Sequence, residues 1–391
     1  MATPKLRFKE FEGDLTESKL VELTLWASGG TPAKDIPEYW GDDIPLISGA
    51  SMHTSQLYES DVKITRLGLQ KGSKLAPKDS ILILVRGSML FNKIPMGITL
   101  GDVAFNQDVK CIRPKQELAP LFLFQWLHAK ENTIQNKVTA TGIGAGKLDT
   151  ADLQNLKLYK PSSEEQTKIA SFLSAVDEKI SQLKQKHALL NQYKQGMMQK
   201  LFSQQIRFKA DDGSEFGEWK ETRVKDIFDV TRGQVLAVSK TVVVADKEYK
   251  FPVFSSQTKQ NGLMGFYKEY LFEDAITWTT DGANAGEVNF RKGKFYCTNV
   301  CGVLKSEKGY ANYCIAEILN RVTRKYVSYV GNPKLMNNVM SEIPITIPRD
   351  IKEQTKIANF LSSIDQKIEV VAQQIEQAKQ WKKGLLQQMF V

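Results

Sequence analysis

Cysteine and histidine are scarce in this chain of 391 residues, which contains four cysteines and three histidines. Four thiols are too few for a disulfide framework in a protein of this length, so reduced thiols are the expected state. The opening residues, MATPKLRFKEFEG, lack the apolar core of a signal peptide. No run of apolar residues approaches the roughly 18 that a membrane helix needs. These absences favour a cytoplasmic protein.

Motifs of catalysis and metal binding are also missing. Cys297 and Cys301 form a Cys-x3-Cys pair, but no second cysteine or histidine pair is near, so buried thiols are favoured over zinc. The stretch 141–148, TGIGAGKL, departs from a phosphate-binding P-loop at its first glycine and at its hydroxyl position. The sequence contains no nucleophile elbow, no HExxH and no Asp/Asn-Pro-Pro-aromatic tetrapeptide of an amino-methyltransferase. We therefore expect a chain that catalyses no reaction by itself.

The composition is that of an ordinary globular protein with a basic balance. Apolar residues make up 42% and charged residues 25% of the chain. Lysine and arginine number 53 against 44 acidic residues, which gives a net charge of +9. A basic balance of this size favours a polyanionic partner such as nucleic acid. The length suits two or three domains.

An internal repeat is the strongest positive signal in the sequence. Residues 165–180, EQTKIASFLSAVDEKI, match residues 353–368, EQTKIANFLSSIDQKI, at twelve of sixteen positions. The correspondence continues without a gap from 193–202 to 381–390, still 188 positions apart. In both copies apolar residues recur at alternating steps of four and three over about five heptads, which is typical of a coiled-coil seam. We expect two long helices that pair with each other.

Each predicted seam contains one lysine, Lys194 in the first copy and Lys382 in the second, at equivalent positions. A polar residue within an apolar seam fixes the register of two helices. The alternative is an ordinary amphipathic helix packed on its own domain, but both stretches exceed the average globular helix. At ~1.5 Å per residue each helix would span roughly 55 Å. The candidate N-caps are Ser162 or Ser163 for the first helix and Asp350 for the second.

The segments that precede the two helices correspond at their ends and differ between them. LRFK at 6–9 matches IRFK at 206–209, and a glycine occupies matching places, Gly29 and Gly233. Between these ends, short β-prone runs alternate with turns rich in glycine, asparagine and proline. Each segment is long enough for one hydrophobic core. The pattern predicts a shared scaffold that presents two different surfaces.

The expected fold class is α/β (α+β), with two similar mixed α/β domains joined by two long antiparallel coiled-coil helices in a pseudo-two-fold circular arrangement. The expected segments are a first domain at 1–160, a central helical region at 161–204, a second domain at 205–347 and a C-terminal helical region at 348–391. Short helices are expected at matching places, 121–130 and 313–322. If the long helices are antiparallel, the last residue should lie near the first.

The order of domain, helix, domain and helix resembles the specificity (S) subunit of type I restriction–modification systems over essentially the whole chain. The two EQTKIA-x-FLS helices, each introduced by a proline-containing strand, are the most specific part of the resemblance. Supporting pieces are the runs Gly29-Gly30-Thr31-Pro32, Trp40-Gly41, Ile44-Pro45, Phe105-Asn106-Gln107-Asp108, Asp281-Gly282-Ala283 and Cys297-Thr298-Asn299. The second half has Thr231-Arg232-Gly233-Gln234 in place of the Gly-Gly-Thr-Pro form, so that loop is not assumed equivalent.

The resemblance implies that each domain is a target recognition domain that reads one half of a bipartite double-stranded DNA sequence. The helices would set the unread spacer and dock two modification subunits, which bind S-adenosylmethionine and methylate adenine. Restriction subunits with ATP-driven translocase and nuclease activity would join this core and cleave unmodified DNA. We expect no cofactor in this chain, and S-adenosylmethionine, ATP and Mg in the partner subunits.

Candidate DNA-binding residues are polar or cationic side chains on predicted loops, which suit phosphate contacts and base-edge readout. In the first domain they are Ser28, Thr31, Ser48, Arg86, Asn106, Gln107, Thr141 and Lys147. In the second domain they are Arg232, Gln234, Ser255, Gln257, Asp281, Asn284, Asn299, Lys334 and Asn337.

Candidate docking residues repeat near the two helix starts and are expected to be exposed, since two copies of one partner need two like surfaces. They are Glu165, Gln166, Lys168, Glu353, Gln354 and Lys356. Two other readings compete with DNA recognition. The first is a non-catalytic coiled-coil adaptor whose two heads bind protein, which would carry aromatic-rich exposed patches. The second is a fused enzyme such as a nuclease, for which the missing motifs leave little room.

Overall fold

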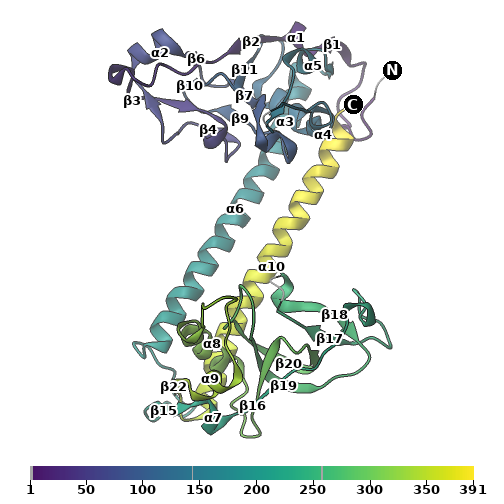
Figure 1. Ribbon diagram of the computed structural model, residues 1–391. Helices are drawn as coiled ribbons and strands as arrows, with labels where there is room; N and C mark the ends of the chain where they lie inside the picture. The colour runs from purple at the N-terminus through teal and green to yellow at the C-terminus, as the bar shows by residue number, and fades with distance from the viewer. Residues whose placement is uncertain (1–2, 143, 257–258) are drawn as a thin grey trace. The chain divides into compact units, whose positions relative to one another are not determined.

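Two long helices carry the repeated sequence in the computed structural model, which describes residues 3–142, 144–256 and 259–391. Helix α6 spans Ser163–Phe202 and helix α10 spans Ile351–Met389 (Figure 1). The chain divides into unit 1, residues 1–185 with 372–391, and unit 2, residues 186–371. Each unit therefore contains the start of one long helix and the end of the other.

Unit 1 is a mixed α/β domain in which short strands form four sheets. The hydrogen-bonded orders are β1-β14, β5-β3-β10-β6, β2-β11-β7-β9-β4 and β12-β13-β8. Its strands are β1 Thr16–Lys19, β2 Thr24–Ser28, β3 Trp40–Ile47, β4 Gln56–Leu57, β5 Lys63–Ile64, β6 Lys74–Ala76, β7 Ile81–Leu84, β8 Arg86–Gly87, β9 Met96–Thr99, β10 Val103–Phe105, β11 Val109–Pro114, β12 Thr139–Ala140, β13 Gly146–Lys147 and β14 Lys157–Lys160. Its short helices are α1 Leu20–Leu23, α2 Arg66–Gly72, α3 Pro120–Ala129, α4 Glu131–Gln135 and α5 Thr150–Gln154.

Strand β7 lies at the centre of the five-stranded sheet of unit 1. All four of its residues, Ile81–Leu84, are buried, because the sheet has protein on both faces. A continuous apolar run of this length is typical of such a strand. The core below it includes α3 and the first half of α6. The sheet therefore packs on the repeated helix.

Unit 2 is a second mixed α/β domain with a simpler set of sheets. A six-stranded sheet has the order β16-β21-β19-β20-β17-β18, and β15 pairs with β22. Its strands are β15 Lys220–Arg223, β16 Asp229–Arg232, β17 Phe251–Phe254, β18 Leu263–Tyr267, β19 Phe272–Thr279, β20 Val288–Cys297, β21 Cys301–Lys305 and β22 Pro344–Ile347. Its short helices are α7 Val224–Ile227, α8 Tyr313–Val322 and α9 Asn337–Glu342.

The two units share a set of framing elements. In each, a two-stranded antiparallel sheet joins the start of the domain to the strand that leads into a long helix, β1 with β14 and β15 with β22. The short helices expected at 121–130 and 313–322 are α3 and α8, which begin at Pro120 and Tyr313. The framing elements confirm the prediction of a shared scaffold.

The long helices pair antiparallel within each unit, as the seam pattern predicted. In unit 1, Ile169 near the start of α6 shares the apolar core with Met389 at the end of α10. In unit 2, Leu201 near the end of α6 shares the core with Ile357 and Leu361 of α10. Most of the predicted seam positions are buried, and the half-buried ones include His187, Ile368 and the two lysines.

The N-caps follow the prediction. The hydroxyl of Ser162 accepts a hydrogen bond from the backbone N–H of Glu165 at 3.3 Å. The carboxylate of Asp350 accepts one from the N–H of Lys352 at 2.8 Å. Both satisfy donors that a helix start leaves unpaired.

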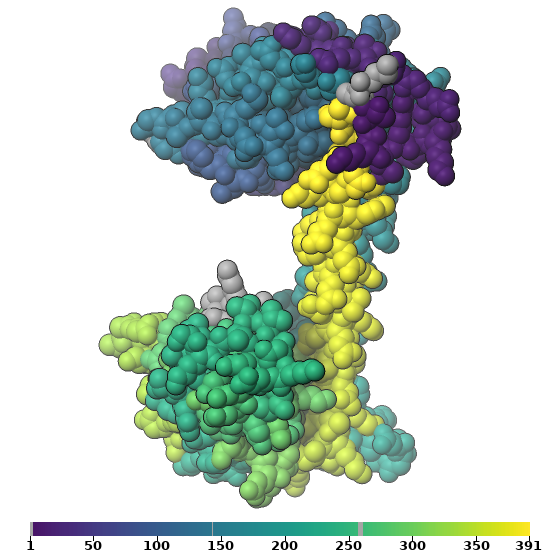
Figure 2. All heavy atoms as spheres, turned by 90° about the vertical axis from the view of Figure 1, so that its right-hand side faces the viewer, coloured from purple at the N-terminus to yellow at the C-terminus, as the bar shows by residue number. Residues whose placement is uncertain are grey.

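The two ends of the chain meet in unit 1. The N–H of Leu6 donates to the carbonyl of Gln388 at 2.9 Å, and Figure 2 shows the purple N-terminal residues against the yellow end of α10. The same contact occurs in unit 2, where the chain is continuous, because the N–H of Ile206 donates to the carbonyl of Lys200 at 3.3 Å. Among the described residues the beginning and the end of the chain lie together, as expected, whereas Met1 itself lies outside the described residues.

Candidate functional site

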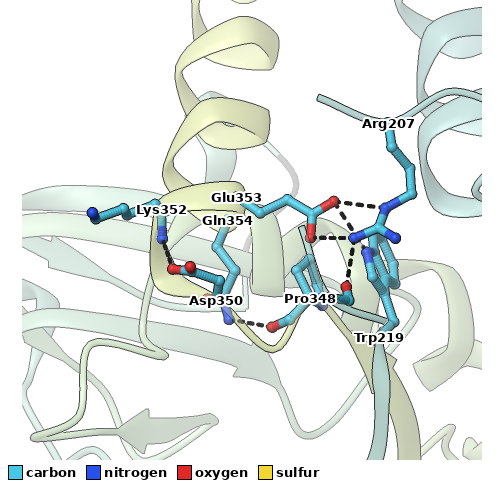
Figure 3. A network of polar contacts seen from close by, with 8 residues as sticks. Arg207, Trp219, Pro348, Asp350, Lys352, Glu353 and Gln354 are labelled. Atoms are coloured by element: carbon cyan, nitrogen blue, oxygen red, sulfur yellow. Dashed lines mark hydrogen bonds and ion pairs between the residues drawn. The ribbon is translucent and has the colours of Figure 1, made fainter. Parts of the chain in front are cut away.

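The start of α10 is held by a buried carboxylate (Figure 3). Glu353, 1% exposed, accepts hydrogen bonds from Arg207 Nε at 3.0 Å and from Arg207 Nη2 at 2.9 Å. Trp219 Nε1 donates a third at 3.3 Å, and Arg207 Nη2 also donates to the carbonyl of Gly217 at 2.7 Å. A bidentate arginine–carboxylate pair fixes both distance and orientation, so it fastens the IRFK segment to the helix.

Unit 1 repeats this anchor at the start of α6. Glu165, 2% exposed, accepts from Arg7 Nε at 2.8 Å and from Arg7 Nη2 at 2.7 Å. Arg7 also donates to the carbonyl of Gly13 at 2.7 Å. The hydrogen bonds to the glutamates raise the pKa of both arginines, Arg7 and Arg207. The matching LRFK and IRFK segments therefore supply the arginine that neutralises the buried glutamate of each helix.

The neighbouring glutamines also bond within their own units. Gln354 donates to the carbonyl of Pro348 at 2.8 Å and accepts from Asn312 Nδ2 at 2.7 Å. Gln166 donates to the carbonyl of Pro161 at 3.0 Å and accepts from the N–H of Ala119 at 2.8 Å. Each glutamine ties the helix start to the beginning of the short helix, α3 or α8, and to the strand before it.

The expectation that the repeated helix starts are exposed docking residues is wrong for Glu165, Gln166, Glu353 and Gln354. All four side chains are buried, because the same polar pattern that repeats on a surface also repeats in a duplicated internal joint. Lys168 and Lys356 keep part of their surface, and they pair with Glu10 and Asp211. Docking through these two lysines stays a prediction.

A polar contact crosses the helix pair in each unit. In unit 1, Lys382 Nζ lies 2.6 Å from Asp177 Oδ1, and Gln125 of α3 donates to the same carboxylate at 2.8 Å. In unit 2, Lys194 Nζ lies 2.7 Å from Asp365 Oδ1, and the hydroxyl of Tyr313 donates to that carboxylate. The seam lysines thus find acidic partners on the opposite helix, as a register device requires.

Four predicted DNA-binding residues line one hollow in unit 1. The hollow has a volume of about 690 Å³. Thr31, Ser48, Asn106 and Gln107 contribute polar groups to it, and the hydroxyl of Thr31 donates to Gln107 Oε1 at 2.7 Å. Its remaining lining residues are Pro32, Lys34, Trp40, Leu46 and Val62. Hydroxyl and amide groups beside an apolar floor suit contacts with base edges and with a thymine methyl group.

Glycine brings the walls of this hollow together. A Cβ at Gly29 would lie 2.1 Å from the carbonyl oxygen of Phe105, so only glycine lets the loop after β2 cross the end of β10. Gly233 makes the equivalent crossing in unit 2, where a Cβ would lie 2.2 Å from the carbonyl oxygen of Cys297. The first glycine of the two loops is therefore equivalent, although the residues that follow it differ.

A second group in unit 1 lies on the three-stranded sheet. Lys147 of β13 is directly opposite Arg86 of β8, and both side chains are exposed. No ion pair involves either of them within the described part of the chain, so both charges are available to phosphate. Thr141 bonds to Ala145 inside the turn between β12 and β13, and Ser28 accepts from Lys110 on β11. These last two residues are engaged in local structure.

In unit 2, four predicted residues gather at the Gly233 crossing. Gln234 follows the glycine, and its N–H donates to the carbonyl of Cys297 at 3.1 Å. Ser255 accepts a hydrogen bond from the hydroxyl of Thr298 at 3.0 Å. Arg232 ends β16, and Asn299 follows Thr298 in the turn between β20 and β21. The side chains of Arg232, Gln234 and Asn299 are exposed, so this cluster is the counterpart of the hollow in unit 1.

The other predicted residues of unit 2 have mixed positions. Lys334 Nζ lies 3.9 Å from Asp281 Oδ1 at a bridge between their backbones. Asn284 is half-buried in the turn that follows Asp281. Asn337 is also half-buried, and its amide donates to the carbonyl of Thr231 at 3.2 Å, so it supports the end of β16. Gln257 lies outside the described residues.

The prediction from the sequence did not include two cationic residues that lie near these groups. Lys34 lines the hollow of unit 1. Its position three residues after Thr31 in a polar loop could have identified it as a candidate DNA-binding residue. Arg291 stacks its guanidinium 3.8 Å from the ring centroid of Phe254, and burial lowers the pKa of Arg291 to about 10. No sequence signal pairs an arginine in β20 with a phenylalanine in β17.

The four cysteines are free and buried. Burial raises the pKa of the Cys301 thiol to about 11 and also raises that of Cys297, so both stay protonated at neutral pH. Among the described residues no cluster of three metal-capable side chains is present. No helix in the same part of the chain is long and apolar enough to cross a membrane.

Comparison with known proteins agrees with this architecture. A family model for the type I restriction modification DNA specificity domain matches residues 12–192 and again residues 217–380. The chain belongs to the type I restriction–modification specificity subunits. Each of the two matched stretches includes one domain and most of its long helix, which agrees with the internal repeat. The resemblance inferred from the repeated helices is confirmed.

Curated relatives align with parts of this specificity subunit. A Mycoplasma pneumoniae protein named for the N-terminus of a type I specificity subunit is 38% identical over 148 residues, which cover 37% of this chain and 76% of that protein. The specificity subunit of the EcoR124I/EcoR124II type I restriction enzyme of Escherichia coli is 30% identical over 174 residues, 44% of this chain and 43% of that subunit.

The whole fold has counterparts among solved structures. The crystal structure of a type I restriction–modification S subunit from M. genitalium superposes with a TM-score of 0.69 at 17% identity and covers 100% of this chain and 99% of that one. A chain from a study of complex assembly in a type I system superposes with a TM-score of 0.56 at 15% identity, covering 96% and 97%. The expected fold class, two mixed α/β domains with long paired helices, is confirmed.

Proposed function

We propose that this specificity subunit reads a bipartite double-stranded DNA sequence, with one half read by unit 1 and the other by unit 2. The observation that carries the proposal is the duplicated joint. Two like anchors, Arg7 with Glu165 and Arg207 with Glu353, support two domains whose loops carry different side chains. Two domains with the same frame and different polar loops are suited to recognise two different DNA sequences in a similar way.

The candidate readers are the groups at the two glycine crossings. In unit 1 they are Thr31, Asn106 and Gln107 at the hollow, and in unit 2 they are Arg232, Gln234 and Asn299. Amide, hydroxyl and guanidinium groups discriminate base edges in the major groove. Arg86, Lys147 and Lys334 contact phosphates, which position the protein without reading sequence.

The paired helices dock two modification subunits, which bind S-adenosylmethionine and methylate adenine, and restriction subunits that use ATP and Mg join this assembly. Two equivalent helix starts would offer two like surfaces to two copies of one partner. Lys168 and Lys356, which lie at equivalent positions and remain partly exposed, are the two candidate docking residues that a partner can reach. This chain supplies no catalytic group, and the cofactors belong to the partners.

Methylation of random duplex DNA by the full chain together with its modification subunit tests the proposal. The variants are Thr31→Ala with Gln107→Ala in unit 1, and Gln234→Ala with Asn299→Ala in unit 2. Each pair should relax one half of the methylated sequence and leave the other half unchanged. At the relaxed half, the preference for the correct base should fall by roughly 10-fold for each lost base contact. Methylation that does not require this chain, or a pair that alters both halves equally, would contradict the proposal.

A further inference from the structure

A short hairpin in unit 2 presents two apolar side chains to solvent. The N–H groups of Ser328 and Lys334 each donate to the carbonyl of the other residue, at 2.8 and 2.9 Å. Between them lie Tyr329, 68% exposed, and Val330, 92% exposed. Single exposed apolar residues are ordinary, so the inference rests on how this pair is held and what surrounds it.

The base of the hairpin is fixed on both sides. Val327 before it and Leu335 after it are buried, and the N–H of Leu335 donates to the carbonyl of Thr280 at 2.9 Å. Trp278 Nε1 donates to the carbonyl of Leu335 at 3.0 Å. The carbonyl of Pro333 accepts from the N–H of Gly282 at 2.9 Å. The tip is therefore presented by a rigid support.

The surroundings of the tip are cationic. Residues 323–341 contain Arg324, Lys325 and Lys334 and no aspartate or glutamate. Arg324 and Lys325 are exposed, and no ion pair engages them within the described residues. Asp281 is the acidic side chain that contacts the segment, at 3.9 Å from Lys334. An apolar tip with the unpaired cations Arg324 and Lys325 nearby complements a base stack flanked by phosphates better than it complements an apolar protein surface.

Unit 1 places a hairpin at the corresponding point. Strands β12 and β13 pair antiparallel, and β13 ends at Lys147, next to the buried Leu148. The N–H of Leu148 donates to the carbonyl of Val85 at 2.9 Å, as Leu335 does to Thr280 in unit 2. The two domains differ in most loops, but in both an antiparallel backbone pairing leads into a lysine and a buried leucine, which indicates a task common to both.

We propose that the hairpin 328–334 enters a groove of the DNA half-site read by unit 2 and places Tyr329 and Val330 against a base step as an apolar wedge. This inference rests on the proposed DNA-reading function. Apolar side chains that contact bases in this way unstack or kink the step. Arg324 and Lys325 would hold the flanking phosphates.

The test uses the full chain with its modification subunit and duplexes that carry 2-aminopurine at successive positions of the half-site assigned to unit 2. The wild type should raise the fluorescence at one step, since unstacked 2-aminopurine is brighter. The double variant Tyr329→Ser, Val330→Ser should lose that signal and weaken binding about 5- to 100-fold at an unchanged slope of affinity against salt. Tyr329→Phe should restore both.

Val243 and Val244, 88% and 75% exposed in another loop of unit 2, provide the matched control, since Val243→Ser, Val244→Ser should change neither signal. A double variant at 329 and 330 that binds and unstacks DNA like the wild type would overturn the wedge. So would a loss confined to binding of the modification subunit. Failure of the wild-type complex to methylate a bipartite sequence would instead defeat the function on which the wedge rests.

Discussion

Lys382 Nζ lies 2.6 Å from Asp177 Oδ1 across the helix pair of unit 1, and Lys194 repeats the contact with Asp365 in unit 2 at 2.7 Å. In both pairs the lysine comes from the later part of one helix and the aspartate from the earlier part of the other. An antiparallel pair out of register would bring each lysine against apolar seam residues. The two contacts therefore select one register from those that the apolar pattern allows.

Lys382→Met should lower the free energy of unfolding of the full chain by about 1–2 kcal/mol, because it leaves Asp177 without its cation in a partly buried place. The exchange Lys382→Asp with Asp177→Lys should recover most of the loss. Lys379→Met, which removes an exposed pair with Glu376 on the same helix, should cost under about 0.5 kcal/mol. Equal losses at 379 and 382 in urea titrations would show that the seam contact has no special role.

Arg207→Met should destabilise unit 2 more strongly than the loss of an exposed ion pair does. The carboxylate of Glu353 would stay buried without its bidentate partner, at a cost of about 3 kcal/mol. Arg207→Lys should recover only part, because an ammonium group cannot bond to both oxygens in the same plane.

The matched control for Arg207 is Arg223→Met, which breaks an exposed pair with Glu342 and should cost under about 1 kcal/mol. Thermal unfolding of the full chain measures both variants. A loss at Arg207 no larger than that at Arg223 would refute the anchor.

The long helices and their pairing were predictable because their signal is local and repeated. The steps of four and three place Ile169 and Ile357 in the seam, and Lys194 and Lys382 stand out because each is polar within that pattern. The buried state of Glu165 was not predictable in the same way. Its partner Arg7 is 158 positions away in sequence. A repeated polar residue can equally be exposed on the surface or buried in a contact that joins two segments.

The hollow in unit 1 was predictable in part. Asn106 and Gln107 follow β10, and Thr31 follows a Gly-Gly pair, so each was recognisable as a polar loop residue. Their assembly depends on Gly29 crossing β10, and that crossing joins segments about 75 residues apart. The hairpin tip at Tyr329 was missed, because an aromatic residue in a turn is as often packed as exposed.

Glu317 gives unit 2 a pH-dependent stability. Burial raises the pKa of Glu317, so the folded state binds its proton more tightly than the unfolded state, and the cost of its charge grows as pH rises. Glu317→Gln should therefore raise the thermal midpoint at pH 8, and the gain should shrink as pH falls toward 5. The ionisable groups that face it from its own helix and its neighbours are Lys194, Arg291, Tyr313, Arg321, Asp365 and Glu369.

Replacement of the exposed Glu307 by glutamine is the control for Glu317, and its effect on the thermal midpoint should be small at both pH values. Differential scanning fluorimetry across this range measures both variants. A gain for Glu317→Gln that is the same at pH 5 and pH 8 would rule out the charge as its origin.

Gly29→Ala and Gly233→Ala should each destabilise the chain by about 2 kcal/mol, because the added Cβ would lie 2.1 or 2.2 Å from a backbone oxygen that belongs to a sheet. Each should also impair reading of the DNA half assigned to its own unit. Gly196→Ala is the control, since nothing lies within 4 Å of a Cβ there. In the interior of α6 that change should stabilise by about 0.5–1 kcal/mol.

Joining the chain ends and cutting near Ser203 should leave a folded and working protein. The contact of Leu6 with Gln388 in unit 1 is the counterpart of the contact of Ile206 with Lys200 in unit 2. The permuted chain would therefore be continuous at the junction in unit 1 and interrupted at the junction in unit 2. Gln204, next to the new ends, has a positive φ of 58°, and cutting there releases a backbone conformation that non-glycine residues rarely adopt.

The permuted protein should keep the far-UV circular dichroism spectrum and the methylation specificity of the parent, with a thermal midpoint within a few degrees of it. A cut within α6 at Gln185 is the matched control, because it divides a helix whose residues pack in both units, and it should abolish cooperative unfolding. A permuted chain cut at Ser203 that fails to fold would mean that the two junctions are not interchangeable, and that the chain ends carry a constraint beyond the duplicated contact.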